Sequence, residues 1–325
     1  MSVLDKIQGS IGPEIGAMNE IISSSLRTDH AVVNGIVDNY LKIKGKQIRP
    51  ILVILAARMF GTVTDRVLYS AAALEMLHNA TLIHDDVLDQ TPLRRGKPTV
   101  NAVWGNHLAV LSGDIFVSKA LATAVHTGSM TIMKSLSALG TELSLGEMDQ
   151  LFNARAHTLT KEAYFRMIER KTASLFRGCV KIGAQAVDAG EQEYTPLVKF
   201  AEKLGLAFQI RDDIFDYFPS DDIGKPSGHD LIEGKVTLPI LCALEVAPHE
   251  ESDKIKAVLQ DDCELTPGLI REIQDFAVRN HGIEMAREEM SRLRKEGLKF
   301  LESYPDSQSK RDFEEIFDFI IERSY

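Results

Sequence analysis

Two stretches of otherwise apolar sequence carry the spacing Asp-Asp-x-x-Asp, and the six aspartates are Asp85, Asp86, Asp89, Asp212, Asp213 and Asp216. In a helix, residues four apart lie about 40° apart on one face and roughly one turn from each other. Like charges at that spacing repel each other, whereas a cation between them reverses the effect. Carboxylate oxygens suit Mg²⁺, which usually takes only one or two protein carboxylates together with water and phosphate oxygens. Each motif therefore predicts half of a metal site for a phosphorylated ligand.

Basic residues follow both motifs. For one motif alone, a solvated acidic helix face is as good an explanation as a metal site. The presence of a second copy favours the metal site. After the first motif a proline ends the predicted helix, because proline cannot continue helical geometry, and Arg94, Arg95 and Lys97 come next. Lys225 and Lys235 follow the second motif. The two helices could therefore face one another across a cavity and hold divalent ions and a diphosphate between them.

Lys46 and Arg49 lie three residues apart at the start of a predicted helix, so they share a face near backbone amides that favour anions. Arginine grips a phosphate through two parallel hydrogen bonds, while lysine offers a compact charge. Solvation at the surface is the alternative for this pair. His78 lies seven residues before Asp85, close to the same helical face. A lone histidine on an apolar helix is more often a core residue than a ligand.

Composition narrows the class of protein. The chain has 325 residues, of which 44% are hydrophobic and 26% are charged, enough for a large core and against wholesale disorder. The net charge of −10 without a dense basic tract argues against a nucleic-acid platform. Three distant cysteines indicate a reducing compartment. The longest apolar run, Ile51 to Ala57, is far below the roughly 20 residues that span a bilayer, so a soluble, cytoplasmic protein is expected.

The hydrophobic periodicity is helical throughout. Helices are expected over 1–26 with a break at Gly12-Pro13, and over 30–43, 51–59, 65–89, 106–124, 129–153, 161–189, 194–218, 231–245, 283–304 and 312–323. The segment from Pro219 to Gly228 is rich in turn residues and is a candidate mobile lid. The sequence thus predicts an all-α protein with one domain, residues 1–325, built as a single large helical bundle around a central cavity.

An ordered set of motifs resembles the trans-isoprenyl diphosphate synthases, the head-to-tail prenyltransferases, and especially their long-chain, octaprenyl-type members. The resemblance runs from about Lys46 to Pro239. Its residues are Gly45-Lys46-x-x-Arg49-Pro50, His78, Asp85-Asp86-x-x-Asp89, Arg94-Arg95-Gly96, Lys171-Thr172, Phe208-Gln209-x-x-Asp212-Asp213-x-x-Asp216 and Gly224-Lys225-x-x-Gly228-x-Asp230-Leu231-x-x-Gly234-Lys235-x-Thr237-x-Pro239. One departure is Lys44, where the family often has a second glycine.

The resemblance implies a role for each residue. Mg²⁺, with three ions per active site, would be held by Asp85, Asp89 and Asp212, supported by Asp86, Asp213 and Asp216. The allylic diphosphate would be bound by Arg94, Lys171, Thr172, Gln209, Lys225 and Lys235. Isopentenyl diphosphate would be bound by Lys46, Arg49, His78 and Arg95. Catalysis would rest on the first two aspartates of each motif with Asp89, Arg94, Lys171 and Lys225. The implied reaction is ionisation, condensation and elimination.

Product length is predicted from the residues before the first motif. The growing chain should run back along its own helix, one turn of which rises about 5.4 Å, similar to one isoprene unit. Family members with short products have aromatic residues four and five positions before the motif, whereas here these are Thr81 and Ala80, with Leu77 a turn deeper. The expected product is therefore about C35–C50, used for quinone side chains. The alternative is that Phe116 or Met148 plugs the tunnel.

Other classes remain open. A shorter-chain farnesyl or geranylgeranyl diphosphate synthase has the same motifs. A terpene cyclase normally pairs one aspartate-rich motif with an Asn/Ser/Glu triad, and a catalytically silent regulatory subunit typically loses motif aspartates. The resemblance implies a homodimer. An insoluble prenyl product suggests transient membrane contact for release, and no nucleic-acid partner is expected.

Overall fold

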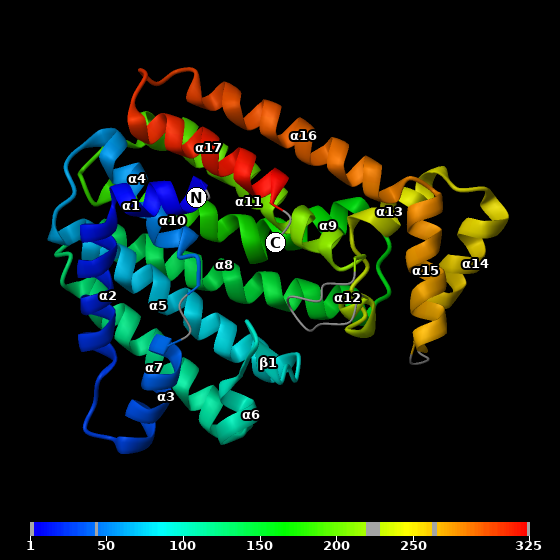
Figure 1. The fold of residues 1–325 in the computed structure, drawn as a ribbon, viewed down its shortest axis with the longest axis horizontal. Coiled ribbons are helices and arrows are strands. Elements are labelled where there is room, and N and C mark those ends of the chain that lie inside the picture. Colours follow the sequence, from blue (N-terminus) through cyan, green and yellow to red (C-terminus); the bar gives the residue numbers. More distant parts are fainter. Residues whose placement is uncertain (1–2, 43–44, 219–227, 262–264, 324–325) are drawn as a thin grey trace. The chain divides into compact units, whose positions relative to one another are not determined.

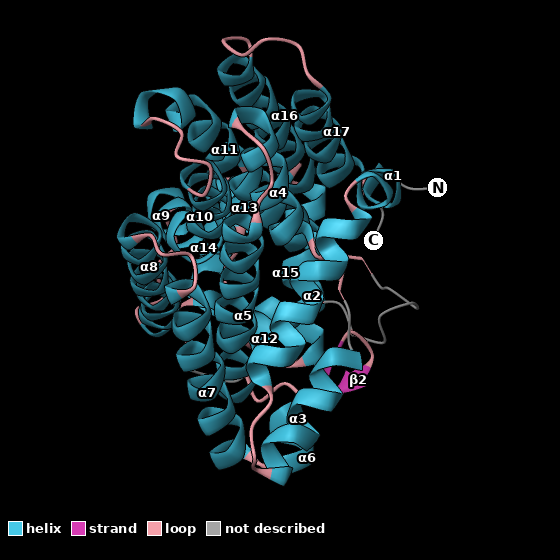
Figure 2. Ribbon diagram, turned by 90° about the vertical axis from the view of Figure 1, so that its left-hand side faces the viewer, coloured by secondary structure: helices cyan, strands magenta, loops and turns pink. Residues whose placement is uncertain are grey.

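The computed structural model describes residues 3–42, 45–218, 228–261 and 265–323. Nearly all of this sequence is helical, as Figures 1 and 2 show. The strands of the described residues are two short ones, β1 (Leu93–Arg94) and β2 (Lys97–Pro98), which pair antiparallel. The all-α prediction is confirmed.

The chain divides into two compact units. The first unit comprises residues 1–141, 175–201 and 300–319, and the second unit comprises residues 142–174, 202–299 and 320–325. Each unit is described by itself below. The single domain over residues 1–325 stays a prediction.

The first unit begins with α1 (Val3–Ser10), α2 (Gly12–Leu26), α3 (Ala31–Lys42), α4 (Ile48–Phe60) and α5 (Asp65–Leu88). After the β-hairpin come α6 (Val100–Trp104) and α7 (Asn106–Val125). The helix α5 packs against α2, α4 and α7. Residues 51–57 of α4 are fully buried, as their continuous apolar sequence predicts. The first acidic motif therefore lies at the end of a helix whose body is fixed by the core.

Four helices contribute residues to both units: α8 (Met130–Arg155), α11 (Glu191–Phe215), α16 (Gly282–Leu301) and α17 (Gln308–Glu322). The helix α10 (Ser174–Gln185) belongs almost entirely to the first unit. The remaining elements of the second unit are α9 (Lys161–Ile168), the π-helix η1 (Glu169–Ala173), α12 (His229–Ile232), α13 (Leu238–Val246), α14 (His249–Leu259) and α15 (Pro267–Arg279). A hydrophobic cluster that includes Ile240, Ile255 and Phe276 joins α13, α14 and α15.

Two predicted helices are interrupted. The helix expected over 161–189 consists of α9, η1 and α10, because a π turn is inserted at residues 169–173. The helix expected over 231–245 is broken between α12 and α13, where Gly234 adopts a φ of 72°. Positive φ angles are accessible to glycine at little cost, so this residue allows the break. Lys171, predicted to bind diphosphate, lies within the π turn, and Lys235, predicted to do the same, follows Gly234 directly.

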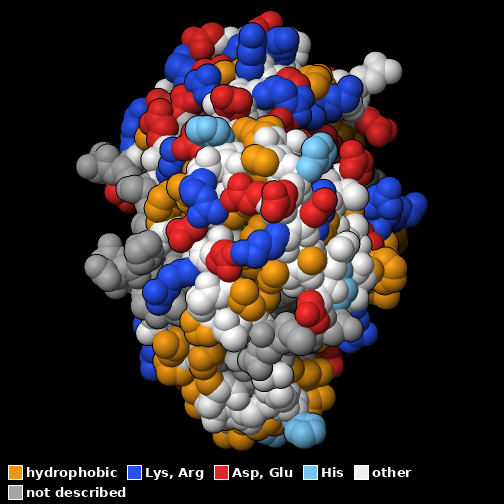
Figure 3. All heavy atoms as spheres, turned by 90° about the vertical axis from the view of Figure 1, so that its right-hand side faces the viewer, with side chains coloured by type: hydrophobic (Ala, Val, Ile, Leu, Met, Phe, Trp, Pro, Cys, Tyr) orange, Lys and Arg blue, Asp and Glu red, His pale blue; other side chains and the backbone are white. Residues whose placement is uncertain are grey.

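One helix among the described residues is long and apolar enough to cross a membrane, judged by length and composition only: α7. It has a mean hydropathy of 1.6, and 39% of its most apolar window is buried. A core helix of a soluble protein passes the same criterion, so the finding is weak evidence for a membrane span. On the face shown in Figure 3, acidic and basic side chains are interspersed, in keeping with the mixed charge of the sequence.

Candidate active site

The first acidic motif ends α5. Asp85 and Asp89 are partly exposed, and the amide of Asp89 donates to the carbonyl of Asp85 at 2.8 Å, so the helical spacing that puts both on one face is retained. Asp86 is 5% exposed and points away from that face into an ion pair. The sequence-based prediction that the motif presents its first and last carboxylates together agrees with this geometry.

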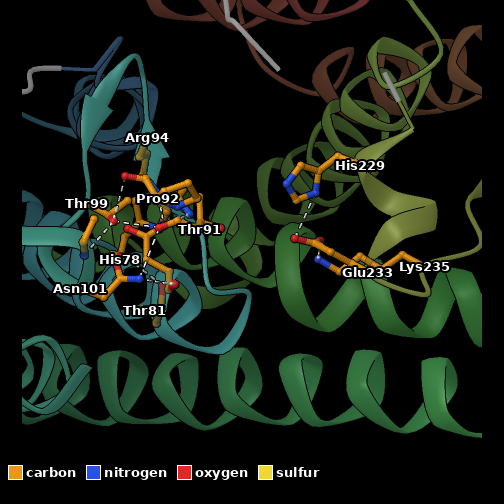
Figure 4. A network of polar contacts seen from close by, with 12 residues as sticks. His78, Thr81, Thr91, Pro92, Arg94, Thr99, Asn101, His229, Glu233 and Lys235 are labelled. Carbon is orange, nitrogen blue, oxygen red and sulfur yellow. Dashed lines mark hydrogen bonds and ion pairs between the residues drawn. The ribbon is translucent and has the colours of Figure 1, made fainter. Parts of the chain in front are cut away.

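Arg94 is the partner of Asp86. Its Nε and Nη2 atoms lie 2.8 and 2.7 Å from Asp86 Oδ1. The hairpin that carries Arg94 turns at Arg95 and Gly96, which have φ angles of 53° and 71°, as a two-residue type I′ turn requires. Thr99 Oγ1 donates to the carbonyl of Thr91 at 2.8 Å and ties the two ends of the hairpin together (Figure 4). This hairpin, which the sequence reading missed, fixes both arginines relative to α5.

The predicted isopentenyl diphosphate residues gather in the first unit. The guanidinium of Arg95 lies directly on Gly45, where a Cβ atom would come within 2.3 Å of its Nη1. His78 is buried, and its pKa lies well below the ordinary value because burial disfavours the charged ring and because Arg49, Arg95 and Arg94 add to that effect. His78 is therefore a neutral group among three cations.

Lys46 and Glu75 are two further charged residues of the first unit. Lys46 is exposed, and its ammonium lies 5.3 Å from the ring centre of Phe319. Glu75 was missed by the sequence reading. Burial raises the pKa of its carboxyl group, and the charges of Arg49 and Arg95 oppose the rise. The sequence feature that could have revealed Glu75 is its position three residues before His78, on the same side of an apolar helix.

In the second unit, the π-helix η1 presents Lys171 and Thr172. π turns inside helices occur frequently at functional sites. The helix α8 approaches this turn closely at Gly146, which has no side chain. A Cβ atom on Gly146 would lie 2.4 Å from the backbone nitrogen of Lys171 and 2.6 Å from its Cα, so only glycine leaves room for the turn. Lys171 Nζ is paired with Glu147 Oε2 at 2.5 Å and donates to Gln150 Oε1 at 2.9 Å. Glu147 and Gln150 thus hold the lysine from the same helix.

The Gly146→Ala variant is expected to lose activity about tenfold to a hundredfold, because the added methyl group collides with backbone that carries Lys171. Overpacking costs about 1–3 kcal/mol, of which the better helix propensity of alanine returns about 1 kcal/mol. Thermal unfolding and kcat/KM check this. Gly140→Ala, on the same helix, is the matched control, since its Cβ would meet Leu77 at an ordinary 4.0 Å. Equal behaviour of the two variants would contradict the prediction.

Lys235 follows the break between α12 and α13. Its Nζ is paired with Glu233 Oε2, and Glu233 Oε1 lies 3.1 Å from Nδ1 of His229 (Figure 4). Burial would raise the pKa of Glu233, but the hydrogen bonds from His229 and Lys235 outweigh it and lower that pKa to about 2. Lys171 and Lys235 are thus each held by a nearby glutamate.

The three aspartates of the second motif have different partners. Asp212 is 41% exposed at its side chain and forms an ion pair with Arg323, whose guanidinium stacks on Phe208 at 4.3 Å. Asp216 accepts from the backbone amides of His229 and Asp230 at 2.9 and 3.1 Å. These contacts cap the start of α12.

Asp213 is buried. Burial raises the pKa of its carboxyl group to about 7, although hydrogen bonds from Tyr164 and Gln209 oppose that rise. The hydroxyl of Tyr164 donates to Oδ2 at 2.6 Å, and Nε2 of Gln209 donates to Oδ1 at 2.8 Å. Thr172 Oγ1 donates in turn to Gln209 Oε1 at 2.7 Å.

A cavity of about 160 Å³ in the second unit brings the predicted residues together. Lys171, Gln209, Asp213 and Lys235 all line it, and Tyr164, Gln150 and Asp230 lie among them. Four residues that the sequence predicted to bind the allylic diphosphate or to support its metal therefore share one polar cavity. Lys225 and most of the candidate lid, residues 219–227, lie outside the described residues. That the two acidic motifs face one another stays a prediction.

The donor set fits a magnesium ion shared with a ligand. Among the described residues, no three His, Cys, Asp or Glu side chains converge as a protein-only metal cage. Mg²⁺ does not need such a cage, since it commonly binds through one or two carboxylates and substrate phosphate oxygens. Asp85, Asp89, Asp212 and Asp216 are partly exposed, and Asp216 already accepts from two backbone amides, whereas Asp86 and Asp213 are buried and paired. Each motif, in its own unit, thus offers carboxylates that suit a metal-bound diphosphate.

Comparison with known proteins identifies the family. The model of the Polyprenyl synthetase family matches residues 30–273. An all-trans-nonaprenyl-diphosphate synthase (geranyl-diphosphate specific) of Rhodobacter capsulatus is 36% identical over 305 residues, which cover 93% of this chain and 92% of that protein. Heptaprenyl diphosphate synthase component 2 of Geobacillus stearothermophilus is 34% identical over 250 residues, which cover 77% of this chain and 76% of that protein.

A solved structure agrees. The crystal structure of a polyprenyl synthase from Caulobacter crescentus, complexed with calcium and isoprenyl diphosphate, matches with a TM-score of 0.91 and 28% identity, covering 99% of this chain and 98% of that one. The chain belongs to the polyprenyl synthetase family and is a trans-prenyltransferase. The names of the matched relatives range from short chain to nonaprenyl diphosphate synthases.

Proposed function

We propose that this protein condenses isopentenyl diphosphate with an allylic prenyl diphosphate in the presence of Mg²⁺ and makes a long-chain all-trans polyprenyl diphosphate of about C35–C50. The observation that carries the proposal is the cavity lined by Lys171, Gln209, Asp213 and Lys235, which joins two lysines to the second acidic motif. Small residues before the first motif support the long product.

Asp85, Asp89 and Asp212 would hold Mg²⁺, three ions per site by resemblance, with Asp86, Asp213 and Asp216 supporting them. Bound metal would neutralise the diphosphate as its bond to the allylic carbon breaks. Lys171 and Lys235 would exchange their glutamate partners for diphosphate oxygens and add fixed positive charge where negative charge develops.

Isopentenyl diphosphate would bind in the first unit. Arg49 and Arg95 supply charge, and the neutral ring of His78 supplies an N–H donor without adding to the repulsion among the cations. The alkene of this substrate attacks the allylic carbon, and a proton is then lost to the departing diphosphate. The mechanism requires no nucleophilic side chain. Apolar walls around the allylic carbon would exclude water, which otherwise converts the allylic cation to an alcohol.

The first test is product analysis. The purified protein is incubated with Mg²⁺, labelled isopentenyl diphosphate and farnesyl diphosphate, with and without chelator, and the products are resolved by length. Products well beyond C20 that disappear with chelator are the expected result. Products that stop at C15 or C20 would contradict the long-chain assignment. Absence of condensation with any primer would favour a catalytically silent subunit.

The proposed assembly is a homodimer that acts in the cytoplasm. The support for the dimer is the exposed apolar surface of α7, where Leu108, Leu111, Leu121 and Val125 are each more than a third exposed. A monomeric mass in sedimentation would contradict it. Cys179 and Cys242, buried and unpaired with each other, are in keeping with a reducing compartment. Transient membrane contact for product release is proposed too, and turnover independent of detergent and lipid would contradict that.

A further inference from the structure

The side chain of Tyr164 contacts Asp213, the central aspartate of the second acidic motif. It lies on α9, is 3% exposed, and its hydroxyl donates to Asp213 Oδ2 at 2.6 Å. That distance is typical of a hydrogen bond between a hydroxyl and a charged carboxylate. A buried hydroxyl costs free energy unless it is paired, and phenylalanine would satisfy the packing here equally well. The hydroxyl group therefore calls for an explanation beyond the hydrophobic core.

The contact is the first of three linked hydrogen bonds. With Asp213 Oδ2 engaged by Tyr164, Asp213 Oδ1 accepts from Gln209 Nε2 at 2.8 Å. The opposite end of the Gln209 amide, Oε1, accepts from Thr172 Oγ1 at 2.7 Å. Because an amide has a donor end and an acceptor end, this chain fixes which end of Gln209 points to Asp213.

The chain connects three elements around one cavity. Tyr164 lies on α9, Thr172 on η1, and Asp213 and Gln209 on α11. Tyr164, Gln209 and Asp213 line the cavity together with Lys171. Lys171 is the residue before Thr172 in η1. The hydroxyl of Tyr164 thus acts on the residues proposed to bind the allylic diphosphate and its metal, without being one of them.

We propose that Tyr164 is a positioning residue for the allylic half of the reaction: its hydroxyl orients Asp213 and, through Asp213, the amide of Gln209. The inference rests on the proposed function, since it assigns the allylic diphosphate to this cavity. Tyr164 lies outside both aspartate-rich motifs and outside the other motifs that resemble the family.

The test is the Tyr164→Phe variant, which removes one oxygen and retains the ring. Binding of Mn²⁺ in the presence of inorganic diphosphate, followed by electron paramagnetic resonance, is expected to weaken about tenfold, the effect of one hydrogen bond to a charged group. The KM for the allylic substrate should rise by a similar factor. The KM for isopentenyl diphosphate should stay unchanged, because its residues lie in the first unit.

Tyr194→Phe is the matched control. Tyr194 is also buried, and its hydroxyl accepts from Gln185 Nε2 at 3.4 Å rather than contacting an acidic motif. This variant should behave as wild type in both measurements. Thr172→Val cuts the other end of the chain and should raise the allylic KM in the same direction, which keeps the inference testable if Tyr164→Phe does not fold.

Two results would overturn the inference. Wild-type Mn²⁺ binding and substrate KM values in Tyr164→Phe would show that the hydroxyl orients nothing of consequence. An equal rise of both KM values together with a lower Tm would show a merely structural role. The Mn²⁺ titration needs no turnover, so it decides the inference even if the wild-type protein does not condense prenyl diphosphates, the result that would refute the proposed function instead.

Discussion

The Asp85→Asn variant is expected to lose about 10²–10³-fold in kcat while it remains folded. Asp85 is partly exposed at the end of α5 and shares its face with Asp89. Asparagine retains the shape and removes the charge, so the loss would come from weaker binding of the cation that neutralises the diphosphate. Steady-state kinetics over a range of Mg²⁺ concentrations measure it, and the Mg²⁺ requirement should rise.

The adjacent Asp86→Asn variant provides the contrast. Asp86 is buried and accepts from Arg94 Nε at 2.8 Å, so its replacement leaves that guanidinium without its carboxylate and loosens the hairpin. We expect this variant to lower Tm more than Asp85→Asn does, because substitutions at partly exposed positions usually have small effects on stability. If Asp85→Asn kept wild-type kcat at saturating Mg²⁺, the assignment of Asp85 as a metal ligand would be wrong.

The second large effect concerns product length. Ala80→Tyr and Thr81→Phe are each expected to shorten the main product to about C15–C20, because an aromatic ring one turn before Asp85 would close a tunnel that lengthens by roughly one isoprene unit per helical turn. The structure buries Ala80 completely and Leu77 nearly so, which puts this stretch inside the first unit. Chromatography of labelled products against length standards measures the change.

Controls separate a shortened tunnel from a damaged core. Overpacking at a buried alanine costs about 1–3 kcal/mol, so Tm and the rate of the first condensation are measured for both variants. A retained first condensation with shorter products supports the tunnel, and unchanged products from both variants would refute it. Of the two alternative plugs, Met148 is 64% exposed, whereas Phe116 is buried in the first unit and packs edge to face on Tyr40 at 5.0 Å.

Local sequence determined most of the helices and the residue types of the proposed site. Apolar periodicity was enough to predict the all-α class. The spacing of apolar residues along a short stretch shows which side of a helix is buried, and that spacing depends only on neighbouring residues. The spacing of Asp85 and Asp89 likewise determined their common face, since helical geometry alone relates residues four apart. The bounds of α5, Asp65–Leu88, differ from the expected 65–89 only at the last residue.

Tertiary structure decided which of these groups are engaged with one another. Nothing in the aspartate spacing reveals that Asp86 pairs with Arg94, that Asp213 receives the hydroxyl of Tyr164, or that Asp216 caps α12. Tyr164 and Asp213 are 49 residues apart in sequence, and their contact depends on how α9 and α11 pack. The π turn at Lys171 likewise depends on the missing side chain of Gly146 on another helix. Sequence thus determined the residue types and their local faces, whereas packing between distant segments selected their partners, because burial makes each polar group depend on whichever segment folds against it.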